Sequence, residues 1–169
     1  MAIRKIITYP HPVLREKAEP ITVFDEALQA LVKDMADTMW DAPGVGLAAN
    51  QIGIARQLVV VDRSTPDNER HYLPLVNPVI TGGEGSIIDE EGCLSVIEYT
   101  ANVKRFRKIY VIARDIEGNP LEFEAEDRFA RIIQHEVDHL LGTLFIDRLS
   151  SLKRALYKKK LKKLLQEQE

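Results

Sequence analysis

The sequence predicts a single-domain α+β fold over residues 1–169, with mostly antiparallel sheets packed around a central helix and another helix at the C-terminal end. Amphipathic patterns of helical period recur along the chain, short β-branched or alternating runs lie between them, and turn residues separate those runs. A chain of this length can bury roughly 70% of the surface that it exposes when unfolded, which is enough for one substantial core. Its hydrophobic content of 45% and charged content of 29% are ordinary for a globular protein.

The first helix is expected to begin near Asp25 and to end at the sequence DAPG, residues 41–44. Apolar side chains recur at helical spacing between these points: Leu28, Leu31, Val32, Met35 and Met39. The β-branched run LVVVD at 58–62 then predicts a buried strand, and YLPLVNP at 72–78 predicts another.

A third strand is predicted around KIYVIARD, residues 108–115. The residues EGNP, 117–120, supply a turn to LEFEAE, residues 121–126, in which apolar and acidic side chains alternate. Because a short turn joins these two runs, we expect neighbouring strands to pair antiparallel.

Two further helices are expected in the last third of the chain. The first covers about 127–141 and is closed by Gly142, and the second covers about 149–166. The second helix is basic. Of the chain's 23 Lys and Arg, eight lie from Arg148 onward beside two Glu, whereas residues 1–147 carry 15 basic and 24 acidic groups.

No apolar run is long enough for a signal peptide or approaches the roughly 18 residues of a membrane span. We therefore expect a cytoplasmic protein with neither a membrane nor a DNA partner. Cys93 is the only cysteine, so no intrachain disulfide can form. Its thiol is left as a buried apolar group, a nucleophile or a metal ligand.

The run QHEVDH, residues 134–139, predicts a metal site on the helix expected at 127–141. His135 and His139 are four residues apart and therefore lie on one face of a helix, where both imidazoles can reach one ion. Glu136 is rotated by about 100° from His135 and can stay close without binding the ion. This arrangement is typical of metal-assisted hydrolysis.

Two histidines are fewer than the three protein ligands that a catalytic metal usually has. Cys93, in the sequence EEGCLS, could supply a third ligand from a loop or strand edge, although a solitary cysteine often only fills space in a core.

The segment GVGLAANQ, residues 44–51, fits the loose dinucleotide-binding pattern through its two glycines and Ala49, and Asp62 follows at a strand end. That pattern needs a strand before it and a helix after it, whereas a helix precedes this segment, so we reject a nucleotide site. The glycines can instead let a backbone pass close to a ligand, with the Gln51 amide nearby.

Taken together, GVGLAANQ, EGCLS and QHEVDH resemble the three signature motifs of bacterial peptide deformylases, in the same order and at similar separations. The opening YPHPVLR is also similar to that family's N-terminal segment, so the resemblance extends over essentially the whole chain. It implies a metal-dependent hydrolase that removes the formyl group from N-terminal formylmethionine of new polypeptides and releases formate.

The resemblance also implies residue roles. Three residues are implied to bind one divalent ion: Cys93, His135 and His139. Glu136 would be the acid and base, while the Gln51 side chain and the Leu94 backbone N–H would hold the formyl oxygen. Gly46, with its neighbour Val45, would bind the substrate peptide. The family favours Fe²⁺ in the cell, although zinc, nickel or cobalt also suits such ligands.

The chain departs from many relatives after EGCLS, where Ile97 and Glu98 replace Pro and Gly. We expect this change to affect the neighbouring loop and peptide preference. His11 and His71 are expected to be surface or structural residues. Two other functions would also use the QHEVDH motif, a zinc endopeptidase and an inactive peptide-binding module with a structural metal. The EGCLS motif argues against the endopeptidase. The acid/base Glu136 argues against the inactive module.

The basic C-terminal helix has two interpretations. Its apolar stripe could pack on the domain while its lysines face solvent; the stripe consists of Leu152, Leu156, Leu161, Leu164 and Leu165. Alternatively, the helix could dock the enzyme on the RNA phosphates of the ribosome surface, as the resemblance to deformylases implies. Removal of the chain from about Leu156 onward is then expected to weaken ribosome binding while sparing the hydrolysis of short peptides.

Overall fold

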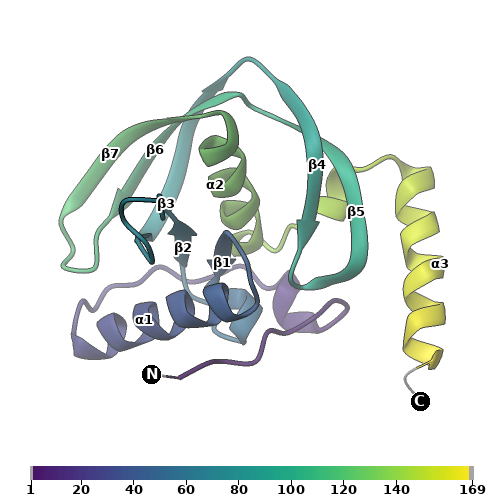
Figure 1. Ribbon diagram of the computed structural model, residues 1–169, viewed down its shortest axis with the longest axis horizontal. Helices are drawn as coiled ribbons and strands as arrows, with labels where there is room; N and C mark the ends of the chain where they lie inside the picture. The colour runs from purple at the N-terminus through teal and green to yellow at the C-terminus, as the bar shows by residue number, and fades with distance from the viewer. Residues whose placement is uncertain (1, 168–169) are drawn as a thin grey trace.

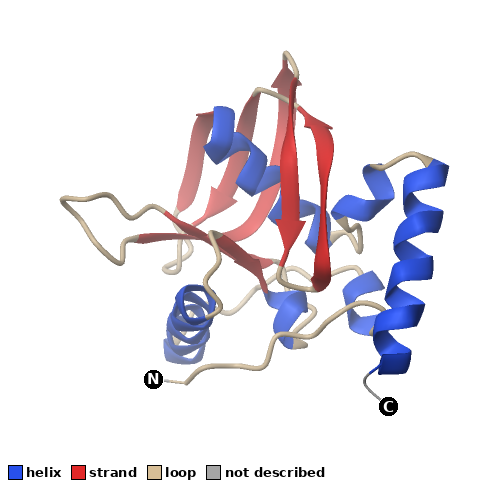
Figure 2. Cartoon of the chain, turned by 45° about the vertical axis from the view of Figure 1, so that its right-hand side comes forward, coloured by secondary structure: helices blue, strands red, loops and turns tan. Residues whose placement is uncertain are grey.

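The computed structural model describes residues 2–167 and confirms the expected α+β class (Figures 1 and 2). The helices are α1 (Glu26–Asp41), α2 (Asp127–Leu140) and α3 (Ser151–Glu167). Short 3-10 turns are η1 (Pro12–Arg15), η2 (Ala49–Ile52) and η3 (Phe145–Arg148). The strands are β1 (Gly46–Ala48), β2 (Leu58–Asp62), β3 (Tyr72–Glu84), β4 (Ile87–Cys93), β5 (Val96–Arg105), β6 (Lys108–Arg114) and β7 (Pro120–Glu126).

A five-stranded antiparallel sheet has the order β1-β2-β3-β6-β7 and is covered by helices on its two faces. Helix α2 packs on one face, where Ile133 and Val137 join a core with Val59, Leu75 and Val111. Helix α1 packs on the other side of the strand β2, and Asp25 caps its first turn by accepting a hydrogen bond from the Leu28 N–H. The expected boundaries of α1, α2, β2, β6 and β7 are confirmed within a few residues, whereas β3 runs on to Glu84 and β1 was not predicted.

The strands β4 and β5 form a separate two-stranded sheet that the sequence did not predict. Figure 1 shows this hairpin on the opposite side of α2 from the five-stranded sheet, so α2 is central, as expected. Its strands escaped prediction because they are rich in acidic and polar residues and lack a continuous apolar run. The hairpin brings Cys93, at the end of β4, over α2.

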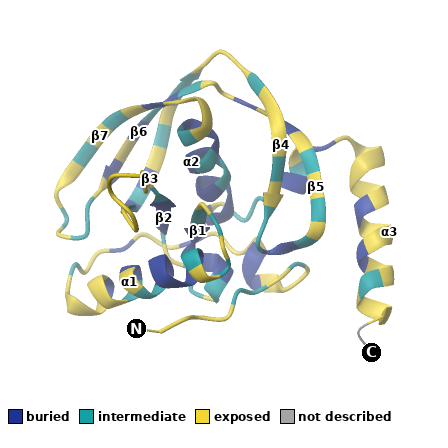
Figure 3. Cartoon of the chain, in the orientation of Figure 1, coloured by how far each residue is buried: buried dark blue, intermediate teal, exposed yellow. Residues whose placement is uncertain are grey.

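Helix α3 stands beyond β5 and buries only one narrow side (Figures 1 and 3). Tyr157 is 0% exposed and Leu161 is 5% exposed, and both join a core cluster with η1, η3 and the hairpin. The interpretation in which the whole leucine stripe packs on the domain is wrong, because Leu152, Leu156 and Leu165 are 70%, 57% and 38% exposed. The tyrosine, rather than those leucines, faces the domain.

Candidate active site

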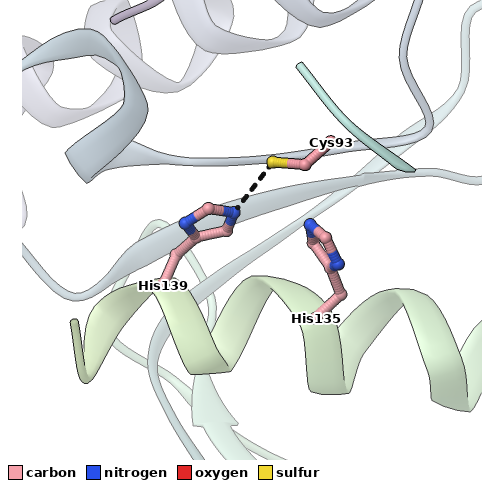
Figure 4. A group of neighbouring side chains, drawn as sticks. All are labelled: Cys93, His135 and His139. Atoms are coloured by element: carbon pink, nitrogen blue, oxygen red, sulfur yellow. Dashed lines mark hydrogen bonds between the residues drawn. The ribbon is translucent and has the colours of Figure 1, made fainter. Parts of the chain in front are cut away.

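Three candidate metal ligands converge where the hairpin meets α2 (Figure 4). Cys93, His135 and His139 each offer a ligand atom, and these atoms all lie within 4.8 Å of one another. The Cys93 Sγ and the His139 Nε2 are 3.3 Å apart. Ligands of one tetrahedral ion stand roughly 3.3–3.8 Å apart, given bonds of about 2.0–2.3 Å, so this cluster fits a single ion with an open position.

The surroundings of the two imidazoles also favour a cation. Burial lowers the pKa of His135, but the Cys93 sulfur and the Glu91 carboxylate outweigh burial and raise it to about 10. The same electron-rich groups that favour a proton on His135 favour a metal cation. Burial holds the pKa of His139 well below its usual value, with a further contribution from His135, which favours the neutral imidazole that metal binding requires.

Glu91 orients His135 from the side of the ring that faces away from the cluster. Its carboxylate contacts the His135 Nδ1 at 3.1 Å, which leaves the Nε2 to face the cluster. It also accepts hydrogen bonds from Arg105 at 2.7 and 2.8 Å and from Arg131 at 2.5 Å. Burial opposes ionisation of Glu91, but His135 and Arg105 prevail and lower its pKa to about 2. A carboxylate held in this way fixes both the orientation and the tautomer of the histidine.

Arg105 extends this network to the other side of α2. Its Nη1 donates to Asp138 at 2.9 Å, and Asp138 also accepts two hydrogen bonds of 2.7 Å from Arg148. Sequence reasoning missed these residues. The pair of acidic residues before Cys93 was the only signal, and it does not say which of the two points inward.

Glu136 lies beside the cluster without joining it. Its Oε1 is 3.8 Å from the His135 Nε2 and 4.0 Å from the His139 Nε2, and the side chain is buried. Burial raises the pKa of Glu136 to about 7, although His135 and Arg105 limit the rise. A carboxyl group with a pKa near neutrality can both take and return a proton.

Gly46 of β1 brings its backbone against the same carboxyl group. A Cβ at this position would lie 2.8 Å from the Glu136 Oε2. Only glycine therefore lets β1 approach Glu136 so closely.

Gln51 and Leu94 complete the surroundings of the cluster. The Gln51 Oε1 accepts from the Ala48 N–H at 3.0 Å, which aims its Nε2 toward the hairpin. That Nε2 donates to the Ser95 Oγ at 3.1 Å and lies 3.7 Å from the Cys93 Sγ. Leu94 follows Cys93 in the turn between β4 and β5 and lines the adjoining cleft. All the predicted site residues are therefore brought together.

A cleft of about 900 Å³ opens over the cluster. One wall contains Val45 and Gly46, and the other contains residues of β4, Glu98 and Tyr99. In the sheet orders β1 and β4 are both terminal strands, so each has an edge with no strand paired to it, although Arg131 donates to the Ile87 and Asp89 carbonyls of β4. Free edges offer unpaired backbone N–H and C=O groups to an extended peptide.

The two remaining histidines lie where the sequence placed them. His11 and His71 are both exposed, and the His11 Nδ1 accepts from the Val13 N–H at 3.1 Å at the start of η1. Within residues 2–167, no helix combines the length and apolarity needed to cross a bilayer.

A family model described as Polypeptide deformylase matches residues 3–155. A peptide deformylase from Desulfotalea psychrophila is 58% identical over 164 residues, which cover 96% of this chain and 97% of that protein. The crystal structure of a peptide deformylase from Legionella pneumophila has a TM-score of 0.90 at 46% identity, covering 99% of this chain and 98% of that chain. One from Thermotoga maritima has a TM-score of 0.84 at 38% identity, covering 89% and 99%.

Proposed function

The chain belongs to the peptide deformylase family, metal-dependent hydrolases that remove the N-formyl group from new polypeptides, and we propose that it catalyses this reaction at the Cys93–His135–His139 cluster. The observation that carries the proposal is this ligand set beside a buried Glu136 and a cleft with two free strand edges. The whole chain, including α3, is proposed to act as one catalytic domain.

A bound divalent ion would lower the pKa of water and polarise the formyl carbonyl. Cys93, His135 and His139 would hold this ion, and the cleft that opens over them would admit water and the formyl group. Glu136 is proposed to take the proton of the attacking water and to deliver it to the departing nitrogen, which could not leave as an anion. Its raised pKa suits both transfers.

Gln51 and Leu94 are proposed to hold the formyl oxygen as it gains negative charge. The Gln51 Nε2 already points at the cluster, and the Leu94 backbone N–H lies in the tight turn that follows Cys93. Donors fixed in advance stabilise a developing oxyanion more than mobile water does.

The peptide that follows the formyl group is proposed to lie between β1 and β4. Val45 and Gly46 would offer backbone groups on one side of it, and the edge of β4 would offer them on the other. Because main-chain hydrogen bonds do not depend on side chains, this mode suits the varied sequences of new polypeptides.

Release of formate from a formyl-Met tripeptide tests the function. We expect Glu136→Ala to retain one metal ion per chain and to lose about 10²–10⁴-fold in kcat, because it removes a base and no ligand. An empty metal site in this variant, or nearly unchanged activity, would contradict the roles assigned here.

Fe²⁺ is the metal that we propose for the cell, since a Cys-His-His set with an open position accepts several divalent ions and family resemblance favours iron. Iron-loaded enzyme should lose activity in air as the iron or its thiolate is oxidised. A nickel-loaded form should last longer. Equal lifetimes in air would argue against an oxidisable metal centre.

Docking of α3 on the ribosome surface is a further proposal, and it places the enzyme in the cytoplasm where new chains emerge. Lys159 and Lys163 are exposed and one helical turn apart. Truncation from about Leu156 is not a suitable test, because it would remove the buried Tyr157 and Leu161. Lys159→Glu/Lys163→Glu should weaken ribosome binding at low salt, whereas Lys5→Glu/Lys17→Glu, outside α3, should not. Equal binding by both variants would reject docking.

A further inference from the structure

The wall of the cleft next to Cys93 contains a segment of β5 that is not paired with β4. The pairing between β4 and β5 passes directly from Gly92–Thr100 to Cys93–Val96. Residues 97–99, here called the bulge segment, therefore have no partner on β4. Glu98 and Tyr99 of this segment line the cleft.

The bulge segment has an unusual backbone. Glu98 has a φ of 50°, which lies in the left-handed region that L residues other than Asn and Asp rarely adopt. Such a conformation persists only where surrounding contacts enforce it.

The inner side of α3 supplies them. The Lys160 Nζ donates a hydrogen bond to the Glu98 backbone carbonyl. One turn earlier in α3, the ring centroid of the buried Tyr157 lies 4.8 Å from that of Tyr99. Both contacts fall on the bulge segment, so α3 holds it by its backbone and by its aromatic side chain.

The contacts continue from Tyr99 to a metal-ligand candidate. The ring of Tyr99 stacks on Phe145 with centroids 6.3 Å apart, and Phe145 stacks on His135 at 6.1 Å. Four rings thus connect α3 to the cluster. The matched family region ends at residue 155, before the two α3 residues that contact the bulge segment.

We propose that Tyr157 and Lys160 are positioning residues for the reaction, which act by holding the bulge segment as the wall of the peptide cleft. Neither touches the reacting atoms. This inference rests on the proposed use of the cleft as the peptide site. It assigns to α3 a role in substrate binding that is separate from docking through its exposed lysines.

Lys160→Met is the first test, because it removes the donor and keeps most of the side-chain stem. Lys153→Met is its matched control, since Lys153 is an exposed lysine two turns earlier on the same face of α3. We expect Lys160→Met to raise KM for a formyl-Met tripeptide about three- to tenfold with kcat within about twofold. Amide exchange in the bulge segment should rise about tenfold, with none of these changes in Lys153→Met.

Lys160→Arg should restore the wild-type KM and the wild-type amide exchange of the bulge segment, because arginine is also a cationic donor. If amide exchange and KM in Lys160→Met matched those in Lys153→Met, the proposal would be overturned. An increase in amide exchange spread evenly over the whole chain would also overturn it. Exchange does not depend on turnover. A wild type that released no formate would therefore defeat the proposed function while leaving the hold on the bulge segment measurable.

A second variant tests whether Lys160 acts by holding Glu98 in its left-handed conformation. Glycine adopts the left-handed region without strain, so Glu98→Gly should reduce the dependence on Lys160. The exchange increase caused by Lys160→Met should then be smaller in the Glu98→Gly background. An equal increase in both backgrounds would show that Lys160 does not act through the conformation of Glu98.

Tyr157 is tested through its ring. Its buried hydroxyl has no hydrogen-bond partner among the described residues, so Tyr157→Phe should leave KM and exchange unchanged. Tyr157→Leu loses the contact with Tyr99 and should raise both. An increase in Tyr157→Phe as large as in Tyr157→Leu would contradict positioning by ring contact.

Discussion

Replacing Glu91 by Gln should damage both the stability of the protein and its affinity for metal. The change keeps the shape of the side chain and removes its charge. Glu91 bonds to two arginines whose side chains are nearly inaccessible, Arg105 at 2% and Arg131 at 7% exposure. It also contacts the His135 Nδ1.

The loss of stability follows from the charges left behind. Removing one partner of a buried ion pair typically costs about 3–5 kcal/mol, because the other charge stays buried. Here Arg105 keeps Asp138, and Arg131 keeps the backbone carbonyls of Ile87, Asp89 and Val103. We therefore expect the lower end, about 3 kcal/mol in the free energy of unfolding.

The loss of metal affinity follows from His135. A carboxylate acceptor on the remote nitrogen orients a ligating imidazole and raises its basicity, and loss of such a partner typically weakens metal binding about 10–100-fold. An amide oxygen retains the hydrogen bond without the charge. We therefore expect Glu91→Gln to weaken metal binding by about 30-fold, near the middle of that range.

Two measurements separate these effects. Urea unfolding in excess chelator gives the stability without a metal contribution, and competition with a chromophoric chelator gives the metal affinity. Glu90→Gln is the matched control, because Glu90 is the adjacent residue and is exposed. Stability within about 1 kcal/mol of the control, together with metal affinity within about threefold, would refute the anchoring role of Glu91.

Three other predictions concern the same site. Gly46→Ala should keep its metal content, but the new Cβ would lie 2.8 Å from the Glu136 Oε2 and displace that carboxylate. Because a displaced base transfers protons less efficiently, we expect kcat/KM to fall at least about tenfold. Wild-type kinetics would contradict this prediction. Cys93→Ala should lose most of its metal by elemental analysis, and retention of one tightly bound ion would exclude the three-ligand cluster. The Glu91 pKa is lowered from 4.5 to about 2, so its contribution to stability should be complete above pH 4.5 and disappear as the pH falls through 2. Urea midpoints of wild type and Glu91→Gln should converge over that window, and a constant difference would be evidence against it.

The helices α1 and α2 could be predicted because each has one apolar face, and a face of period 3.6 is visible in the sequence alone. The hairpin of β4 and β5 could not. Its inward side chains contact α2, η3 and α3, and several of them are charged or polar, so the hairpin has no continuous apolar run. A strand of this kind reveals its pairing only when the elements packed against it are known.

The candidate site divides in the same way. The residues that perform the proposed chemistry could be predicted, because metal ligands and an acid/base need particular residue types at particular spacings. The residues that hold them could not. Glu90 and Glu91 are adjacent and chemically identical, and only the phase of the strand decides that Glu91 points at α2 while Glu90 is exposed.

The C-terminal helix shows why an apolar pattern can mislead. Five leucines suggested the packed side, yet the position of Tyr99 decides which residues of α3 are buried, and Tyr99 comes from a distant strand. The ring of Tyr157 fills that contact. The leucines on the other side of α3 are left exposed among the lysines.

Two of the contacts that hold the hairpin lie on either side of Cys93 along the chain. Glu91, two residues before it, ties β4 to α2 through His135. Glu98, five residues after it, is tied to α3 through Lys160. Because one contact reaches a metal-ligand candidate and the other reaches the cleft wall, loss of the first should appear mainly in metal affinity and loss of the second mainly in KM. The hairpin would thus set metal binding and peptide binding through separate contacts, which explains how α3 can influence the cleft without contributing a residue to the metal cluster.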